Sequence, residues 1–188
     1  MNEQWESWDS RPGLKDFERI FHDHHAAVYH FLRRLLPSTE DVEDCVQETF
    51  LRFWRSRASY KEKGLARAYL FKIARNLAVD QIRRHQSLKE QAVPLEEMES
   101  SLEARADLDD AFEKRELATM VRKKVSELPI SQRETFLMFR YHGMSYEEIA
   151  DIQGVSVRTV DSRLYRAMKW LGQQLNGHAA RMSEGDAR

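Results

Sequence analysis

Two short helix-like runs separated by only four residues constrain the fold more than any other feature of the sequence. In the first run, Ser145 is followed three residues later by Glu148, which is a capping box that opens a helix. Gly154 can adopt the left-handed conformation that ends this helix, and Ser156 supplies an N-cap for the second run. The sequence therefore predicts two helices joined by a tight turn.

The second run has one face to bury and one to expose. Its apolar residues recur at steps of three and four, which predicts a buried stripe of Val157, Val160, Leu164, Met168, Leu171 and Leu175. The outward face holds hydrogen-bond donors suited to phosphates and base edges, namely Arg158, Thr159, Ser162, Arg163, Arg166 and Lys169. This pattern is typical of a helix-turn-helix whose second helix reads DNA. A helical hairpin with a solvated basic face is the alternative.

Composition favours an all-α protein with two small domains. The 188 residues include only 7 glycines and 4 prolines, and helical periodicity extends over long stretches. Cys45 is the one cysteine, which excludes an internal disulfide and suits the cytoplasm. No apolar run reaches the roughly eighteen residues of a membrane span, so we expect no membrane insertion and no signal peptide.

Charge is segregated along the chain although the net charge is only −1. Residues 86–113 contain two basic and nine acidic residues, a net charge of −7, so the remainder sums to +6. Local patches of charge, and not the overall balance, decide what such a protein binds. Pro94 and weak periodicity indicate that residues 86–112 form an acidic linker.

The predicted domains lie on either side of this linker. An N-terminal arm (1–13) precedes a three-helix domain (14–85), and a helical domain that contains the helix-turn-helix (113–176) precedes a disordered tail (177–188). The second helix, which Ser38 or Thr39 caps, buries Val42, Cys45, Val46, Thr49, Phe50, Phe53 and Trp54. In the later domain one helix ends at Pro129, and Ser131 opens another that carries Phe136, Leu137 and Phe139.

Four segments in order resemble the sigma factors of bacterial RNA polymerase, specifically the small two-domain extracytoplasmic-function type. The first two read DVEDCVQETFLRFW (41–54) and YLFKIARNLAVDQIRR (69–84). The last two read LPISQRETFLMF (128–139) and the helix-turn-helix itself. The resemblance covers about residues 14–175. It implies a non-enzymatic polymerase subunit without a cofactor, which selects promoters and is held by an anti-sigma factor in many relatives.

The resemblance assigns contact with core RNA polymerase to the helix at 41–54. The residues it implies are Asp41, Glu43, Asp44, Gln47 and Glu48. An acidic, polar face beside a buried stripe suits a basic partner surface. For Asp41 a helix-start charge favoured by the macrodipole is an equally good explanation.

The resemblance assigns promoter DNA around minus ten to the helix at 69–84, which has five basic residues and one acid between positions 67 and 84, a net charge of +4. The implied contacts are Lys72, Arg75, Asn76, Asp80, Arg83 and Arg84. Asp80 either touches DNA or pairs with a neighbouring arginine. The preceding loop, around 59–64, would hold a flipped base. Tyr69 replaces the family's usual tryptophan, and either packs inward or stacks near DNA.

The resemblance assigns the element around minus thirty-five to the helix at 156–170. The implied contacts are Ser156, Arg158, Thr159, Ser162, Arg163 and Arg166.

The sequence lacks the features that other functional classes require. A stand-alone repressor needs a dimerisation or ligand domain, and an enzyme needs a catalytic constellation. The histidines at 22, 24, 25 and 30 have no accompanying metal-binding motif, so we expect no metal site but a polymerase-facing or solvated helix.

Overall fold

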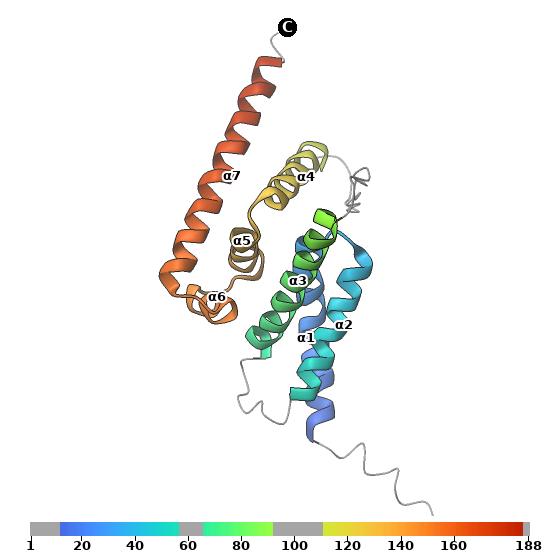
Figure 1. Cartoon of the computed structure of the whole chain (residues 1–188). Coiled ribbons are helices and arrows are strands. Elements are labelled where there is room, and N and C mark those ends of the chain that lie inside the picture. Colours follow the sequence, from blue (N-terminus) through green and yellow to red (C-terminus); the bar gives the residue numbers. More distant parts are fainter. Residues whose placement is uncertain (1–11, 57–65, 92–110, 186–188) are drawn as a thin grey trace, which may run out of the picture. The chain divides into compact units, whose positions relative to one another are not determined.

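The computed structural model describes residues 12–56, 66–91 and 111–185, which form seven helices and no strand (Figure 1). The chain divides into an N-terminal unit and a C-terminal unit, with the division between Pro94 and Leu95. Among these described residues, no helix is both long enough and apolar enough to cross a membrane. The all-α class predicted from composition is confirmed.

The N-terminal unit consists of α1 (Pro12–Leu35), α2 (Thr39–Ser56) and α3 (Ala66–Gln91), each of which contacts the other two. Phe31 of α1 and Phe71 of α3 are fully buried, with ring centroids 5.1 Å apart. The other fully buried apolar side chains of this unit are Val28, Leu32, Val42, Leu70, Ala74 and Ala78. The stripe predicted for α2 is buried except at Trp54, which is half-buried.

The start of α2 follows the predicted capping chemistry. The Ser38 hydroxyl accepts a hydrogen bond from the Asp41 backbone N–H at 3.3 Å, so Ser38, and not Thr39, is the cap. Two turns further on, the buried Thr49 hydroxyl donates to the Cys45 carbonyl at 2.6 Å, which satisfies a polar group inside the core. Cys45 is buried beside it, and desolvation raises the pKa of its thiol to about 11.

Helix α3 is longer than predicted, because it continues to Gln91 through six residues assigned to the linker. Residues 86–91 contain neither glycine nor proline, and extending an existing helix costs less than nucleating one. The remainder of the predicted linker, except its last two residues, and the loop at 59–64 lie outside the described residues.

The C-terminal unit consists of α4 (Ala111–Glu127), α5 (Ile130–His142), α6 (Tyr146–Gln153) and α7 (Val157–Gly185). Helix α7 contacts all three of the others. Its buried stripe is Val160, Leu164, Ala167 and Leu171. The prediction was wrong for Val157 and Met168, which are 41% and 56% exposed. The stripe was misplaced because it followed the large apolar residues and skipped the small Ala167, which keeps the helical period.

Helix α5 differs from the prediction at its start. The helix begins at Ile130 after Pro129, and no side chain caps it, so Ser131 does not open it. Its buried residues are Glu134, Thr135, Leu137 and Met138, whereas Phe136 is half-buried and Phe139 is 37% exposed. Two polar side chains, Glu134 and Thr135, therefore occupy core positions of α5.

Arg133 joins the end of α4 to the start of α5. Its guanidinium donates to the backbone carbonyls of Ser126 and, at 3.1 Å, of Leu128. These carbonyls belong to the last turn before Pro129, where a helix leaves acceptors without intrahelical donors. Desolvation lowers the pKa of Arg133 from its usual value. A charged side chain of α5 therefore supplies the hydrogen-bond donors for the end of α4.

The end of α7 corrects the predicted tail. The helix continues to Gly185, so residues 177–185 are helical where the sequence indicated disorder. Alanine, arginine, methionine and glutamate in this segment are good helix formers, and the helix is already nucleated by its packed part. Lack of an apolar period therefore removed the packing signal without removing the helix.

Candidate nucleic-acid interface and partner surface

The turn between α6 and α7 has the predicted helix-turn-helix chemistry. The Ser145 hydroxyl accepts from the Glu148 backbone N–H at 3.2 Å, and the Glu148 carboxylate accepts from the Ser145 N–H at 2.7 Å. Gly154 then takes φ 65°, in the left-handed region. The Ser156 hydroxyl accepts from the Thr159 backbone N–H at 3.2 Å, which caps α7. The sequence prediction for this turn is confirmed.

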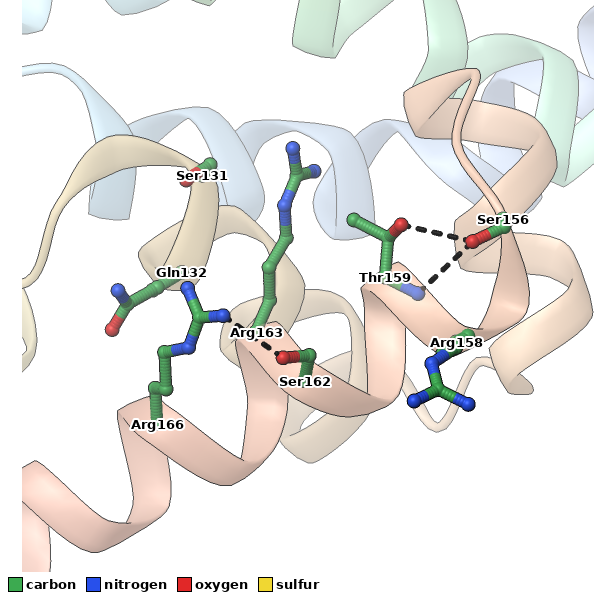
Figure 2. Close-up of a pocket in the computed structure, with 8 residues that line it drawn as sticks. All are labelled: Ser131, Gln132, Ser156, Arg158, Thr159, Ser162, Arg163 and Arg166. Carbon is green, nitrogen blue, oxygen red and sulfur yellow. Dashed lines mark hydrogen bonds between the residues drawn. The ribbon is translucent and has the colours of Figure 1, made fainter.

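A hollow opens where the start of α7 meets the start of α5. We call it the basic hollow, and it is lined by Ser131, Gln132, Ser156, Arg158, Thr159, Ser162, Arg163 and Arg166 (Figure 2). All six residues predicted for the minus thirty-five contacts lie in it. Two residues from α5 complete it, and the sequence reading did not include them. Three guanidinium groups among hydroxyls and an amide suit phosphates and base edges.

The three arginines of the basic hollow are held differently. Arg158 is exposed. Arg166 is also exposed, and its guanidinium donates to the Ser162 hydroxyl at 3.1 Å, as the dashed line in Figure 2 shows. Arg163 is half-buried, and its guanidinium donates to the Gln153 side-chain oxygen at 2.8 Å. Only the last of these contacts ties a predicted reading residue to the core of the unit.

A buried polar network lies behind Arg163. The Gln153 amide nitrogen donates to the Glu134 carboxylate at 3.0 Å and to the Thr135 hydroxyl at 2.9 Å. Glu134 and Thr135 have no exposed surface, and Gln153 is 8% exposed. The sequence reading missed this network. Its only signal was the presence of polar residues at helical core positions, because its members are 18 or 19 residues apart in the chain.

The residues predicted to contact the minus-ten element lie at intervals along α3, and we call them the basic row. Arg75 donates to the Asn76 side-chain oxygen at 3.2 Å, and Arg83 lies 4.0 Å from the Asp80 carboxylate. Asp80 therefore pairs with a neighbouring arginine, which was one of the two roles predicted for it; the other was contact with DNA. The remaining members of the row are Lys72, which is half-buried, and Arg84, which is exposed.

Tyr69 and the predicted polymerase-binding acids lie on the same unit. Tyr69 is half-buried, and its ring centroid is 6.1 Å from that of Phe53, so its ring packs against α2. Asp41 is occupied within the unit: it accepts from Gln81 at 2.6 Å and lies 3.0 Å from the His85 ring nitrogen. Asp41 is therefore an acid at the start of α2 that also binds side chains of α3.

The other four predicted polymerase contacts lie further along α2. Glu43, Asp44 and Gln47 are exposed, and Glu48 accepts from Arg52 at 2.6 Å. Beside them is a second hollow, between α1 and α2, which we call the apolar hollow. It is lined by Phe21, His25, Tyr29, Glu43, Val46, Gln47 and Phe50. Phe21 is 40% exposed there.

The histidines of α1 have separate environments. His25 lies in the apolar hollow, with ring centroids 4.8 Å from Phe21 and 6.0 Å from Phe50. His22 lies 3.4 Å from Asp23 and is exposed. Burial lowers the pKa of His24, with smaller effects from Asp23, which raises it, and Arg67, which lowers it. Within the described residues no group of histidine, cysteine or acidic side chains is arranged to hold a metal ion.

Comparison with known proteins links both surfaces to one family. Residues 20–88 match the family model described as Sigma-70 region 2, and residues 118–171 match Sigma-70, region 4. The "ECF RNA polymerase sigma-E factor" of Salmonella typhimurium is 34% identical over 146 residues, covering 74% of this chain and 76% of its own. "ECF RNA polymerase sigma factor SigE" of Mycolicibacterium smegmatis is 28% identical over 171 residues, covering 91% and 66%.

Two solved structures are similar in fold. The sigma factor RpoE of Bartonella quintana, in complex with the anti-sigma factor NepR, has a TM-score of 0.71 and 27% identity over 87% of this chain and 98% of its own. CnrH, in complex with the cytosolic domain of CnrY, has a TM-score of 0.62 and 25% identity, covering 87% of this chain and 89% of its own.

Proposed function

Because the chain belongs to the extracytoplasmic-function branch of the sigma-70 family, we propose that it binds core RNA polymerase and directs it to specific promoters. The chemistry of RNA synthesis is left to the core enzyme, so the protein itself is not a catalyst. Its place of action is where the chromosome and the polymerase are, the cytoplasm. The observation that carries the proposal is the basic hollow on the first turns of α7.

The basic hollow supports recognition of the upstream promoter element. A helix of a helix-turn-helix enters the major groove with its N-terminal residues toward the bases, and Ser156, Arg158 and Thr159 begin α7. Arg163 and Arg166 follow on the next turns, still in the hollow. Guanidinium groups pair with guanine edges or with phosphates, so the hollow has the donors that both kinds of contact require.

The basic row on α3 supports contact with the element around minus ten. Lys72, Arg75, Arg83 and Arg84 supply the positive charge that holds a nucleic-acid backbone. Asn76 accepts a hydrogen bond from Arg75, and Asp80 forms an ion pair with Arg83, so we assign them to orienting these arginines. Melting of the duplex next to this row belongs to the same proposal.

The apolar hollow supports docking of core polymerase on the N-terminal unit. Phe21 is exposed on its wall, and Glu43 and Gln47 add polar groups to its lining. Interfaces with this composition combine an aromatic anchor with charges that select the partner. Glu43, Asp44 and Gln47 are the acids and amide we assign to this contact, whereas Asp41, which is bonded to α3, is reassigned to stabilising the unit.

An anti-sigma factor is the further partner we propose. The structures of RpoE and CnrH were both determined as complexes, with NepR and with the cytosolic domain of CnrY. A protein that covers the apolar hollow or the basic hollow would prevent the contacts proposed above.

Run-off transcription with purified core polymerase tests the function. We expect transcripts with defined 5′ ends, whose upstream sequences share two elements. Alanine at Arg158 or Arg166 should reduce their yield, whereas alanine at the exposed Arg140, outside the hollow, should not. A chain that yields no defined start, although it is folded by circular dichroism, would contradict the proposal.

Charge reversal tests the polymerase surface separately. Glu43→Lys with Asp44→Lys should weaken association with core polymerase, and Glu18→Lys, an exposed reversal on α1, is the matched control. Equal affinity of all variants for core, measured by native gel shift, would remove this surface from the proposal.

A further inference from the structure

Gln153 is the last residue of α6 and connects the core of the C-terminal unit to the basic hollow. Its side-chain oxygen accepts from Arg163, and its side-chain nitrogen donates to Glu134 and Thr135. All four heavy-atom distances in this cluster that involve Gln153 lie between 2.8 and 3.2 Å. One amide thus joins α5, α6 and α7.

Glu134 determines which way this amide points. A carboxylate only accepts hydrogen bonds, so the amide end that faces it has to be the nitrogen. The Thr135 hydroxyl has a shorter contact with the Ser131 carbonyl, 2.7 Å, than with the Gln153 oxygen, 3.2 Å. The Thr135 hydroxyl therefore donates its proton to the Ser131 carbonyl, and its oxygen accepts from the Gln153 amide nitrogen. The Gln153 oxygen then faces Arg163.

Arg163 is consequently restrained before any DNA arrives. A long side chain loses rotamer freedom when it is fixed in a complex, and prior restraint removes part of that cost. Restraint also limits the directions in which the remaining guanidinium N–H groups can donate. Arg158 is exposed, and Arg166 donates to the hydroxyl of Ser162 on its own helix, so neither is tied to the core in this way.

We propose that Gln153 is a positioning residue for promoter specificity, which holds the Arg163 guanidinium in one orientation while Glu134 fixes the direction of the Gln153 amide. This inference rests on the proposed function and names the side chain through which one position of the upstream element is discriminated. Arg163 is the group that touches DNA, and Gln153 acts through it.

The test uses holoenzyme, reconstituted from the full chain and core polymerase. Its probe is a library based on a promoter mapped by run-off transcription, with the upstream element randomised. For Gln153→Met, which keeps the volume but cannot accept from Arg163, we expect discrimination to fall at least about fivefold at one or two adjacent base pairs. The dependence of affinity on salt should be retained, because the number of phosphate contacts is unchanged.

A double-variant comparison separates positioning from general damage. With Arg163→Ala already present, Gln153→Met should cause no further change in the base preferences. With Arg158→Ala present, Gln153→Met should reduce base discrimination by the same factor as in the parent, because the two sites are independent. Equal losses in both backgrounds, or unchanged base preferences in Gln153→Met alone, would overturn the inference.

Glu134→Gln keeps the inference testable if the methionine variant does not fold. This change is nearly isosteric, but an amide at position 134 can also donate, so the Gln153 amide is no longer forced in one direction. We expect a smaller loss at the same base pairs, and retention of the full parental preference would overturn the proposal. A parent holoenzyme that enriches no sequence contradicts the proposed function itself, and this inference with it.

Discussion

The two units of the molecule reach a folded state by different means. The N-terminal unit is held by aromatic packing. The ring centroid of Phe17 lies 4.9 Å from that of Trp54 and 6.4 Å from that of Phe53, and Phe31 packs on Phe71. The C-terminal unit buries Glu134, Thr135 and Gln153 alongside its aliphatic core. Its two glycines of positive φ, Gly143 and Gly154, end α5 and α6.

The interiors of the two units respond differently to substitution. Apolar burial is non-directional, so a core of rings and aliphatic groups tolerates changes in shape if volume is kept. A buried hydrogen-bond network has to be complete in geometry and in partners. In the C-terminal unit this network reaches Arg163, so under the proposed function a core substitution there can alter DNA reading without unfolding the unit.

Removing one large ring should break the N-terminal unit first. Phe31→Ala deletes a fully buried side chain, and such changes cost about 3–5 kcal/mol of unfolding free energy. The effect is measured by urea unfolding, with amide hydrogen exchange as the readout for each unit. Amides of α1–α3 should lose protection from exchange, while those of α5–α7 keep it. Leu51→Ala, at a 41% exposed position, is the control. Loss of protection in both units together would show that they are not independent.

Removing the donor that joins α4 to α5 should weaken the C-terminal unit. Arg133→Met keeps much of the stem but leaves the Ser126 and Leu128 carbonyls without their guanidinium donor, at a cost of about 1–3 kcal/mol. The midpoint of urea unfolding of this unit should fall, and Arg140→Met, on the exposed face of α5, should leave it in place. A neutral Arg133→Met result would mean that water replaces the lost bonds at no cost.

The turn glycine isolates a backbone effect. A Cβ at Gly154 would meet no atom within 4 Å, so the cost of Gly154→Ala comes from its φ of 65° alone, about 1–2 kcal/mol. Gly154→Asn should cost less, because asparagine tolerates the left-handed region better. Thermal unfolding of the three chains gives the comparison, and an alanine variant as stable as the parent would contradict this account of the turn.

The smallest expected effect is a pH dependence of the N-terminal unit. Burial lowers the pKa of His24 in the folded chain, so the unfolded chain binds a proton more readily. Stability from this residue is therefore present above about pH 6.5 and is lost as the pH falls below that value. His24→Gln should flatten the fall in melting temperature between pH 7 and 5. His22→Gln, at an exposed position on the same helix, should leave the slope of the parent.

Local chemistry could be predicted from the sequence, and distant pairing could not. The capping box at Ser145, the turn at Gly154 and the stripe of α2 each depend on residues within a few positions of one another. The Asp41 contacts with Gln81 and His85 join residues 40 and 44 positions apart, so no local pattern indicates them. The placement of Gln153 against Glu134 is hidden for the same reason.

The basic hollow shows how far a prediction from local periodicity extends. Six of its eight lining residues could be predicted from one helical face, because the period of a helix fixes which side chains share a face. Ser131 and Gln132 come from α5, whose position beside α7 depends on how the core packs. The same packing put Ala167 in the buried stripe and left Met168 at the surface.

Cys45 offers a consequence of a different kind. Its thiol is buried, and desolvation raises its pKa to about 11, so the reactive thiolate is scarce at neutral pH. Alkylating reagents therefore modify it chiefly when α2 opens. Since the sequence has no other cysteine, the rate of modification is a native reporter of opening in the N-terminal unit alone. A bound partner that steadies this unit would slow the labelling, with no probe added to the chain.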